Sequence, residues 1–352
     1  PITGPLEPDA AGFKWGADEA AKDLNALYAD DNVQFEIVEL DSGCSGDVAG
    51  PAAQTLVDSG VVAVVGAACS GASMGANAVL AAAGIPMISY ASTNPGLSDA
   101  SAYPHFYRVV PSDAIQGPAG ADMMADAGVT NESLAILHMT NHYGSSLADS
   151  IKASWETNGS LCGAGMQGYE ADATDFAPLV TAIVDDASCE AVYLSSYITD
   201  GALILEELAE QGFTGKVFGG DGPAGYGLFD ELTDNTVADG FTVSAPRVGE
   251  SYGDFESRYD ANAADIESIK LYVLTAYDTT MIVGDAIAKS YSEGTDLNEN
   301  IGIIGTNYEG ASGLITFLDN GDGIGNGYDF CVYDGVDDYD CNLFWTFNEG
   351  IQ

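Results

Sequence analysis

The chain has 352 residues, of which 54 are aspartate or glutamate and only 9 are lysine or arginine, so its formal net charge is −45 at pH 7. Such a surface cannot neutralise phosphates, which excludes nucleic acid and anionic membranes as partners. Hydrophobic residues make up 46% of the chain, and its length exceeds that of one ordinary core. We therefore expect two folded domains with an acidic surface, which we interpret as an adaptation to saline, halophilic surroundings.

Segments typical of helices and of strands alternate along the whole chain. In the first third we expect helices at residues 10–27 and 51–59 and strands at residues 33–40, 61–65, 85–90 and 106–110. A second series follows, with strands at 133–139, 165–169, 191–194 and 216–218 and helices at 145–158, 176–186 and 202–211. A strand at 240–246, helices at 253–262 and 272–290 and hairpins after residue 313 complete the chain. This alternation predicts an α/β protein with two doubly wound, Rossmann-like lobes.

The segment 61–93 has the pattern of a strand, a turn, a helix and a second strand. Ser70 and Gly71 fall at the expected start of the helix, where a hydroxyl and unpaired backbone N–H groups can receive a carboxylate or phosphate. The second strand ends in the polar turn 91–93, at the carboxyl edge of the same sheet, where ligands of open α/β sheets bind. The segment therefore predicts an anion site, and the alternative for Ser70 is a plain helix cap.

Six cysteines form an even set without a CxxC pair, which disfavours a zinc site and indicates disulfides in an oxidising compartment. Pairing neighbours in sequence gives Cys44–Cys69, Cys162–Cys189 and Cys331–Cys341, although other connectivities remain open. No apolar run is long enough to span a membrane. We expect an extracytoplasmic protein, periplasmic or at the cell surface with or without a lipid anchor, secreted through a signal peptide that has been removed.

Three other kinds of site are weaker interpretations. Residues 71–75 fit the GxSxG pattern of a serine hydrolase, but Ser73 falls about one turn inside the expected helix instead of at the turn. His138 and His142 are four residues apart without a nearby carboxylate, which disfavours zinc. Residues 319–322, Asp-Asn-Gly-Asp, either bind calcium or form a turn.

Several short motifs are spread along the chain. They are Thr3-Gly4-Pro5, the pair Cys44 and Cys69 followed by Ser70, Ala91-Ser92-Thr93-Asn94-Pro95, Gln116-Gly117-Pro118, Tyr143-Gly144, Thr174-Asp175-Phe176 and Asp319-Asn320-Gly321-Asp322. In order and spacing they resemble the type I extracytoplasmic solute-binding proteins of ABC transporters, in the branched-chain amino-acid (Leu/Ile/Val) family. The resemblance covers nearly the whole chain.

The resemblance implies two lobes joined by a hinge of three crossings, with the ligand in the cleft between the lobes. We place the crossings near Asp113, Pro246 and Leu318. The first lobe then comprises residues 1–113 with 247–318, and the second comprises 114–246 with 319–352. Members of the family have a central strand just before the Thr-Gly-Pro turn, so we also expect further residues ahead of Pro1.

The resemblance also assigns ligand-binding residues. Ser70, Ala91 and Thr93 match the positions that bind the ligand's α-carboxylate, with Cys69 beside them, and Asp221 matches an acid, more often glutamate, that pairs with the α-ammonium. Tyr143, Tyr197 and Tyr272 match aromatic positions that form walls of the pocket.

Two further positions bear on ligand size. Asp9 stands where an aromatic residue is common, and Ala68 where larger side chains are common. A roomier pocket with an acid would admit a longer or cationic side chain, but in a chain this acidic we expect Asp9 to lie on the surface.

The function implied is that of a binding protein, not an enzyme, which closes two lobes over a small amino acid and delivers it to permease subunits. Aliphatic side chains are expected first, and polar, aromatic or amide ligands next. We expect a monomer that needs no cofactor and no metal. A ligand-sensing receptor module for amino acids, amides or related molecules is the alternative, and a serine hydrolase is a remote one.

Overall fold

The computed structural model describes residues 1–157, 159–262, 266 and 268–352. The chain divides into two compact units, which we call unit 1 (Pro1–Ser112 with Val248–Asn326) and unit 2 (Asp113–Arg247 with Gly327–Gln352). It therefore passes between the units three times. The first two passages lie within one residue of the positions expected from the sequence.

The third passage was expected near Leu318, and this prediction is wrong. Residues 319–326 belong to unit 1, not to the second lobe. They are held there by Arg108, whose backbone N–H donates to the carbonyl of Gly321 (3.0 Å) and whose Nε lies 2.7 Å from Oδ1 of Asp322. A charge pair of this kind keeps the turn beside the strand that carries Arg108.

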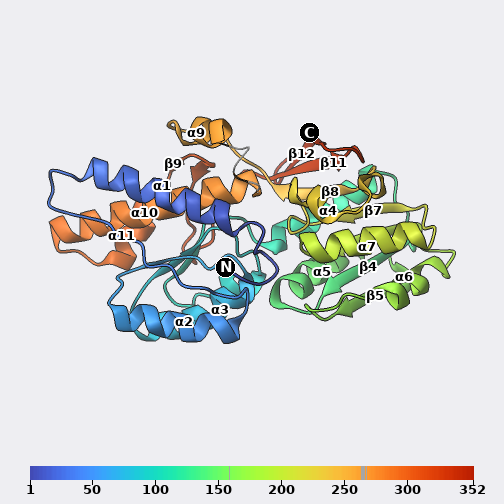
Figure 1. Cartoon of the computed structure of the whole chain (residues 1–352), viewed down its shortest axis with the longest axis horizontal. Coiled ribbons are helices and arrows are strands. Elements are labelled where there is room, and N and C mark those ends of the chain that lie inside the picture. The colour runs from blue at the N-terminus through green and yellow to red at the C-terminus, as the bar shows by residue number, and fades with distance from the viewer. Residues whose placement is uncertain (158, 263–265, 267) are drawn as a thin grey trace. The chain divides into compact units, whose positions relative to one another are not determined.

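Unit 1 contains a small parallel sheet in the order β1-β2-β3. Its strands are β1 (Val64–Val65), β2 (Met87–Ser89) and β3 (Phe106–Arg108), and a separate hairpin is formed by β9 (Tyr308–Gly310) and β10 (Gly313–Ile315). Its helices are α1 (Ala10–Leu27), α2 (Gly46–Ser59), α3 (Ser70–Ala82), η1 (Pro95–Ser98), α9 (Phe255–Asn262), α10 (Lys270–Glu293) and α11 (Leu297–Ile304). Helix α1 packs along α10, and α2 along α3 (Figure 1).

Residues 33–40 were predicted to form a strand, but the structure has no strand there, and β1 is shorter than expected. The segments 34–42 and 61–67 instead line a cavity of about 720 Å³. The backbone of Phe35 is bound by the side chain of Asn25, through its N–H (2.8 Å) and its carbonyl (3.0 Å). A strand exists only where a neighbouring backbone pairs with it, and residues 33–40 have no such pairing within the described part of the chain.

Unit 2 contains one sheet in the order β13-β12-β11-β8-β7-β6-β4-β5. The parallel strands are β4 (Leu134–Met139), β5 (Leu161–Tyr169), β6 (Ala191–Ser195), β7 (Lys216–Gly219) and β8 (Thr242–Pro246), and the antiparallel extension is β11 (Tyr328–Tyr333), β12 (Tyr339–Thr346) and β13 (Gly350–Ile351). Its helices are α4 (Asp113–Asp126), α5 (His142–Trp155), α6 (Ala177–Val184), α7 (Ile198–Glu210), α8 (Gly227–Glu231) and η2 (Asn235–Ala238). This series follows the predicted order.

Central strands β4 and β6 are buried over their whole length, which explains their apolar sequences, since strands covered on both faces do not alternate. The predicted helix 145–158 corresponds to α5, and its expected end at Asn158 lies outside the described residues. The hairpins expected after residue 313 are present as the antiparallel pairs of β11 with β12 and of β12 with β13.

The six cysteines form the three disulfides obtained by pairing neighbours, Cys44–Cys69, Cys162–Cys189 and Cys331–Cys341. The first lies in unit 1 and joins the loop ahead of α2 to the residue ahead of α3. Within the described residues, no helix has both the length and the apolarity needed to cross a membrane.

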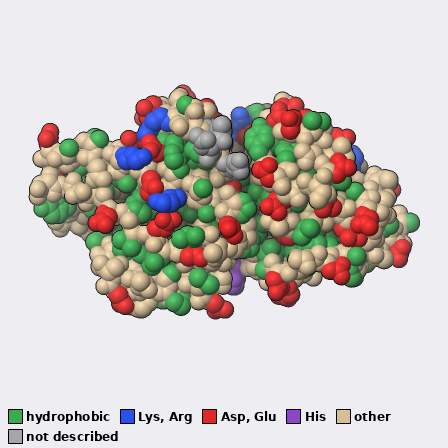
Figure 2. All heavy atoms as spheres, in the orientation of Figure 1, with side chains coloured by type: hydrophobic (Ala, Val, Ile, Leu, Met, Phe, Trp, Pro, Cys, Tyr) green, Lys and Arg blue, Asp and Glu red, His purple; other side chains and the backbone are tan. Residues whose placement is uncertain are grey.

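On the face shown in Figure 2 the acidic side chains are widely spread, whereas most of the basic ones visible there lie near α1 and α9. All nine lysines and arginines lie in the described part of the chain. Eight form ion pairs with carboxylates, and the ninth, Lys216, donates to the carbonyl of Ala127. The excess negative charge is therefore not balanced by the chain itself.

Candidate functional site

Ser70 is placed in unit 1 by β1 and the helix that follows it. The N-cap residue of α3 is Cys69, and Ser70 is the first residue of the helix, so the interpretation of Ser70 as the helix cap is wrong. Its Oγ accepts the backbone N–H of Asn94 at 3.2 Å instead. The side chain is 2% exposed. Cys69 is held by its disulfide, which fixes the start of this helix.

The loop 91–94 follows β2 and lies beside Ser70. Ser89 supports it from the end of the strand, because its Oγ accepts the N–H groups of Ser92 (2.9 Å) and Ala91 (3.3 Å). Thr93 is 1% exposed, and its Oγ1 has no hydrogen-bond partner among the described residues. A buried hydroxyl without a partner is costly, so this group is suited to a ligand.

Arg108 is a supporting residue that sequence reasoning missed. It is fully buried, and its Nη1 donates to the carbonyls of Asn94 (3.0 Å) and Ser92 (3.3 Å) while its Nε pairs with Asp322. It therefore holds the backbone on both sides of Thr93. A basic residue inside an apolar strand, in a chain with only nine, was the available signal.

Residues 319–322 form a turn, and an acid of this turn, Asp322, pairs with Arg108. The carboxylate of Asp322 pairs with Arg108 through Oδ1 and accepts from Nδ2 of Asn320 (3.0 Å) through Oδ2. Both carboxylate oxygens of Asp322 thus already have protein partners. This favours the interpretation of residues 319–322 as a turn over their interpretation as a calcium site.

Tyr272 and Asp9 lie near the start of α10. Tyr272 is in the first turn of α10, is 3% exposed, and its ring centroid lies 6.4 Å from that of Phe13. Asp9 is 1% exposed, so the prediction that it lies on the surface is wrong. It is buried because its Oδ1 accepts the N–H of Ile269 at 3.1 Å, which holds it between α1 and α10. Burial raises the pKa of Asp9 to about 6.

In unit 2, three predicted residues follow three parallel strands. Tyr143 is the second residue of α5 and comes after β4, Tyr197 precedes α7 after β6, and Asp221 follows β7. All three are at most 5% exposed. Parallel neighbours end at the same edge of the sheet, so the three side chains meet there.

The contacts among these residues are direct. The rings of Tyr143 and Tyr197 stack with centroids 5.0 Å apart and an interplanar angle of 30°. The hydroxyl of Tyr143 donates to Oδ1 of Asp221 at 2.9 Å and accepts the N–H of Gly222 at 2.9 Å. Two aromatic faces and a carboxylate thus form one group, an arrangement that favours a cation.

Asp200 is a second supporting residue that sequence reasoning missed. Its Oδ1 accepts the N–H of Tyr197 at 2.9 Å, and its Oδ2 accepts the hydroxyl of Tyr169 at 2.5 Å. Burial raises the pKa of Asp200 to about 6. The residue fixes the backbone that carries Tyr197, and an acid three residues after a helix start was the signal for it.

The remaining alternatives fit the structure poorly. Ser73 is fully buried inside α3 and hydrogen-bonds to the carbonyl of Ala67 (3.1 Å) and to Ser92 (2.8 Å), so it cannot act as an exposed nucleophile.

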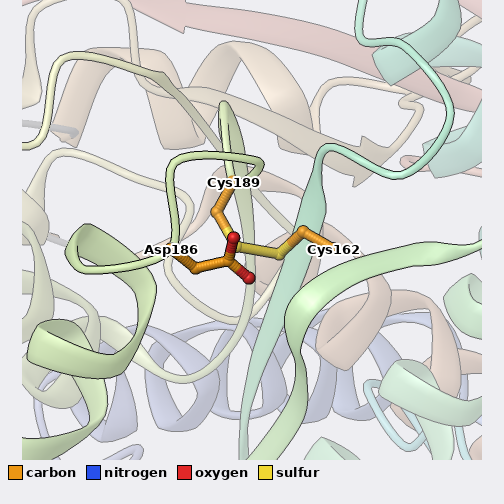
Figure 3. A group of neighbouring side chains, drawn as sticks. All are labelled: Cys162, Asp186 and Cys189. Atoms are coloured by element: carbon orange, nitrogen blue, oxygen red, sulfur yellow. A yellow bond between two sulfur atoms is a disulfide. The ribbon is translucent and has the colours of Figure 1, made fainter.

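Among the described residues, one group has the spacing of metal ligands, Cys162, Asp186 and Cys189. Its sulfur atoms are joined in a disulfide (Figure 3), so neither is a free thiolate that could bind a metal.

Comparison with known proteins identifies the class. Residues 1–326 match the family model described as periplasmic binding protein, and the chain belongs to this family. It is 26% identical over 337 residues to the leucine-, isoleucine-, valine-, threonine- and alanine-binding protein of Pseudomonas aeruginosa, covering 95% of this chain and 87% of that one. It is 27% identical over 288 residues to the leucine-specific-binding protein of Salmonella typhimurium, covering 79% and 74%.

Solved structures agree on the fold. The leucine-binding protein of Thermotoga maritima superimposes with a TM-score of 0.83 at 22% identity, covering 97% of this chain and 95% of that one. A branched-chain amino acid transporter substrate-binding protein of Streptococcus pneumoniae, in complex with isoleucine, gives 0.81 at 22%, covering 95% and 94%. A solute-binding protein from R. palustris, in complex with benzoate, gives 0.81 at 12%, covering 98% and 94%.

The fold is therefore the α/β fold of type I periplasmic binding proteins. More particularly, the chain is a distant relative of branched-chain amino-acid binding proteins, at 26–27% identity. It belongs to a family of binding proteins, not of enzymes.

Proposed function

We infer that this protein is the extracytoplasmic substrate-binding component of an ABC transporter and that it captures a small amino acid with groups from both units. The observation that supports this function best is chemical. Unit 1 offers hydroxyl and N–H groups suited to a carboxylate, and unit 2 offers a carboxylate between aromatic rings, suited to an ammonium group.

Three groups of unit 1 would receive the α-carboxylate. They are Oγ of Ser70, the unpartnered Oγ1 of Thr93 and the N–H groups in the first turn of α3. The partial positive charge of a helix N-terminus favours an anion, and a carboxylate accepts from all of these donors.

In unit 2 the α-ammonium would bind Asp221, with the faces of Tyr143 and Tyr197 beside it. An aspartate here is one methylene shorter than the glutamate more common in the family, so the ammonium must approach more closely or bind through a water. A ligand that contacts both units stabilises the conformation in which both contacts exist, which is how hinge closure is coupled to binding.

The side chain of the ligand is a separate question. The names of the two relatives favour aliphatic amino acids, with Leu, Ile and Val first. Aromatic carboxylates are the second candidates, because two solute-binding proteins with this fold were solved with benzoate and with 3,4-dihydroxybenzoic acid. These acids have no ammonium group with which Asp221 could form an ion pair.

The test is a thermal-shift screen of the twenty amino acids, their amides, benzoate and 3,4-dihydroxybenzoate, followed by calorimetry. Saturating ligand at about 100 times its dissociation constant should add roughly 2.7 kcal/mol of stability. We expect an α-amino acid to give the largest shift. Stabilisation by the aromatic acids alone would show that the amino-acid assignment is wrong.

A matched variant tests the carboxylate half. Thr93→Val keeps the shape of a buried side chain and removes a hydroxyl that has no partner in the described residues. Losing this hydroxyl should not destabilise the free protein. It should weaken ligand binding by about 10- to 100-fold, which is the contribution of a hydrogen bond to a charged group. Equal affinities would exclude Thr93 from the site. Uptake of the ligand by vesicles that contain the permease would separate transport from sensing.

A further inference from the structure

Asp9 is a buried acid with half of its carboxylate unused. The side chain is 1% exposed, Oδ1 accepts the N–H of Ile269 at 3.1 Å, and its backbone carbonyl accepts Oγ of Ser268 at 2.9 Å. Oδ2 has no hydrogen-bond partner among the described residues. Leaving a buried carboxylate oxygen without a donor costs free energy, so this oxygen favours a partner beyond the described residues.

No basic side chain neutralises Asp9 within the described part of the chain. The nine lysines and arginines are engaged elsewhere, eight in ion pairs with other carboxylates and Lys216 with a backbone carbonyl. Asp9 stands at the N-cap of α1 and receives the N–H of the N-cap residue of α10. Two positive helix termini therefore favour its charged form, yet neither satisfies Oδ2.

Asp9 belongs to the same corner of unit 1 as the candidate site. One turn after it, Phe13 packs against Tyr90 (centroids 5.1 Å apart) and against Tyr272 (6.4 Å). Tyr90 directly precedes the loop of Ala91 and Thr93, and its carbonyl accepts Oγ1 of Thr275 from α10 at 2.9 Å. The N-terminal turns of α1 and α10 and the end of β2 thus surround one region.

We propose that Oδ2 of Asp9 accepts an N–H from the side chain of the ligand, and that the preferred ligand is therefore an amino acid whose side chain ends in a protonated nitrogen. This rests on the proposed function and replaces the aliphatic side chain favoured by the relatives' names. The α-carboxylate and α-ammonium keep their groups in units 1 and 2.

The experiment measures affinities by calorimetry for L-lysine, L-ornithine and L-arginine against L-norleucine and L-leucine. Norleucine has the carbon skeleton of lysine without the amine, so the comparison isolates the contact in the unmodified protein. We expect the best cationic amino acid to bind at least tenfold more tightly than norleucine.

Protein variants supply the second arm. Asp9→Asn retains an oxygen for the N–H of Ile269 but removes the charge, and should reduce the preference for the cationic ligand at least tenfold. Asp9→Leu should reverse it in favour of norleucine. Asp18→Asn removes a charge from the exposed side of the same helix and should leave the preference unchanged.

The outcomes are distinguishable. If norleucine or leucine binds the unmodified protein as tightly as the cationic amino acids, the role of Asp9 is wrong and the amino-acid function stands. If no amino acid binds, the proposed function itself is wrong. If the Asp9 variants do not fold, the ligand comparison in the unmodified protein still decides the question.

Discussion

The hydroxyl of Tyr143 joins Asp221 to the backbone that follows it, donating to Oδ1 of Asp221 and accepting the N–H of Gly222, both at 2.9 Å. Because an ionised carboxylate only accepts hydrogen bonds, the hydroxyl proton of Tyr143 points at Asp221. The hydrogen bond orients the carboxylate of Asp221. We propose that the carboxylate held in this way receives the ammonium group of the ligand.

Replacing Asp221 by asparagine should lower the affinity for the best amino acid strongly. Removing one partner of a buried charge pair costs on the order of 2–5 kcal/mol. Calorimetry measures the change, with Tyr143→Phe as a milder variant that removes only a supporting hydrogen bond, at about 1 kcal/mol. Unchanged affinity of Asp221→Asn would show that the ammonium binds elsewhere.

Arg108→Lys should weaken ligand binding although Arg108 itself contacts only protein. Lysine keeps the charge near Asp322 but cannot reach the carbonyls of Ser92 and Asn94 at the same time. We expect a loss of stability of about 2–4 kcal/mol, since buried carbonyls lose their donors. A stable variant with unchanged affinity would contradict the assigned role in holding the loop of Thr93.

The disulfides should be fully formed and should stabilise the protein. Cys44–Cys69 closes a loop of 25 residues, and removing it by a double serine substitution should cost about 3–4 kcal/mol. Chemical denaturation measures the loss, and the same change at Cys331–Cys341, with a separation of 10, should cost slightly less. Free thiols or other pairings in non-reducing peptide maps would contradict the assignment.

Stability should rise steeply with sodium chloride. With a net charge of −45, repulsion is severe when the Debye length is about 30 Å, near 0.01 M salt, and mild when it is about 3 Å, near 1 M. Melting temperatures across this range test the idea, and potassium chloride controls for a specific sodium effect. A flat profile would mean that local pairing or bound cations accommodate the charge, and the interpretation as adaptation to salt would fall.

Stability should also rise as the pH falls from 7 towards 5. Burial raises the pKa of Asp9, Asp200 and Asp278 from 3.8 to about 6, so the folded state binds protons more tightly than the unfolded state. The stability that these three carboxyl groups contribute by binding protons in the folded state is fully present below about pH 4. It is lost as the pH rises through about 6. We expect a gain of about 4 kcal/mol between pH 7 and pH 5 in dilute buffer, about 1.3 kcal/mol from each of the three groups.

The pH prediction has an internal control. The variant Asp278→Asn has no titrating group at this position, so its stability should depend less steeply on pH. The variant also weakens the hydrogen bonds to Ala311 and Ser312, which should lower its stability at every pH. An unchanged slope would assign the pH dependence to surface carboxylates alone.

The sequence by itself determined the order of most elements and the positions of the candidate site residues along them. Ser70, Thr93 and Asp221 follow strands, and each could be placed at a sheet edge because a strand and the turn after it are adjacent in the chain. The disulfide pairs could also be predicted from the sequence, since each joins two cysteines that are consecutive along the chain.

Only the tertiary structure decided features that depend on distant partners. Asp9 is buried by Ile269, 260 residues away, and Arg108 is matched by Asp322, 214 residues away, so neither the hidden acid nor the third passage at Asn326 could be predicted locally. The alternation in residues 33–40 predicted a strand, but pairing requires a neighbouring backbone, and the segment lines a cavity instead. Local pattern decides which structure a segment prefers, and its distant neighbours decide whether it forms.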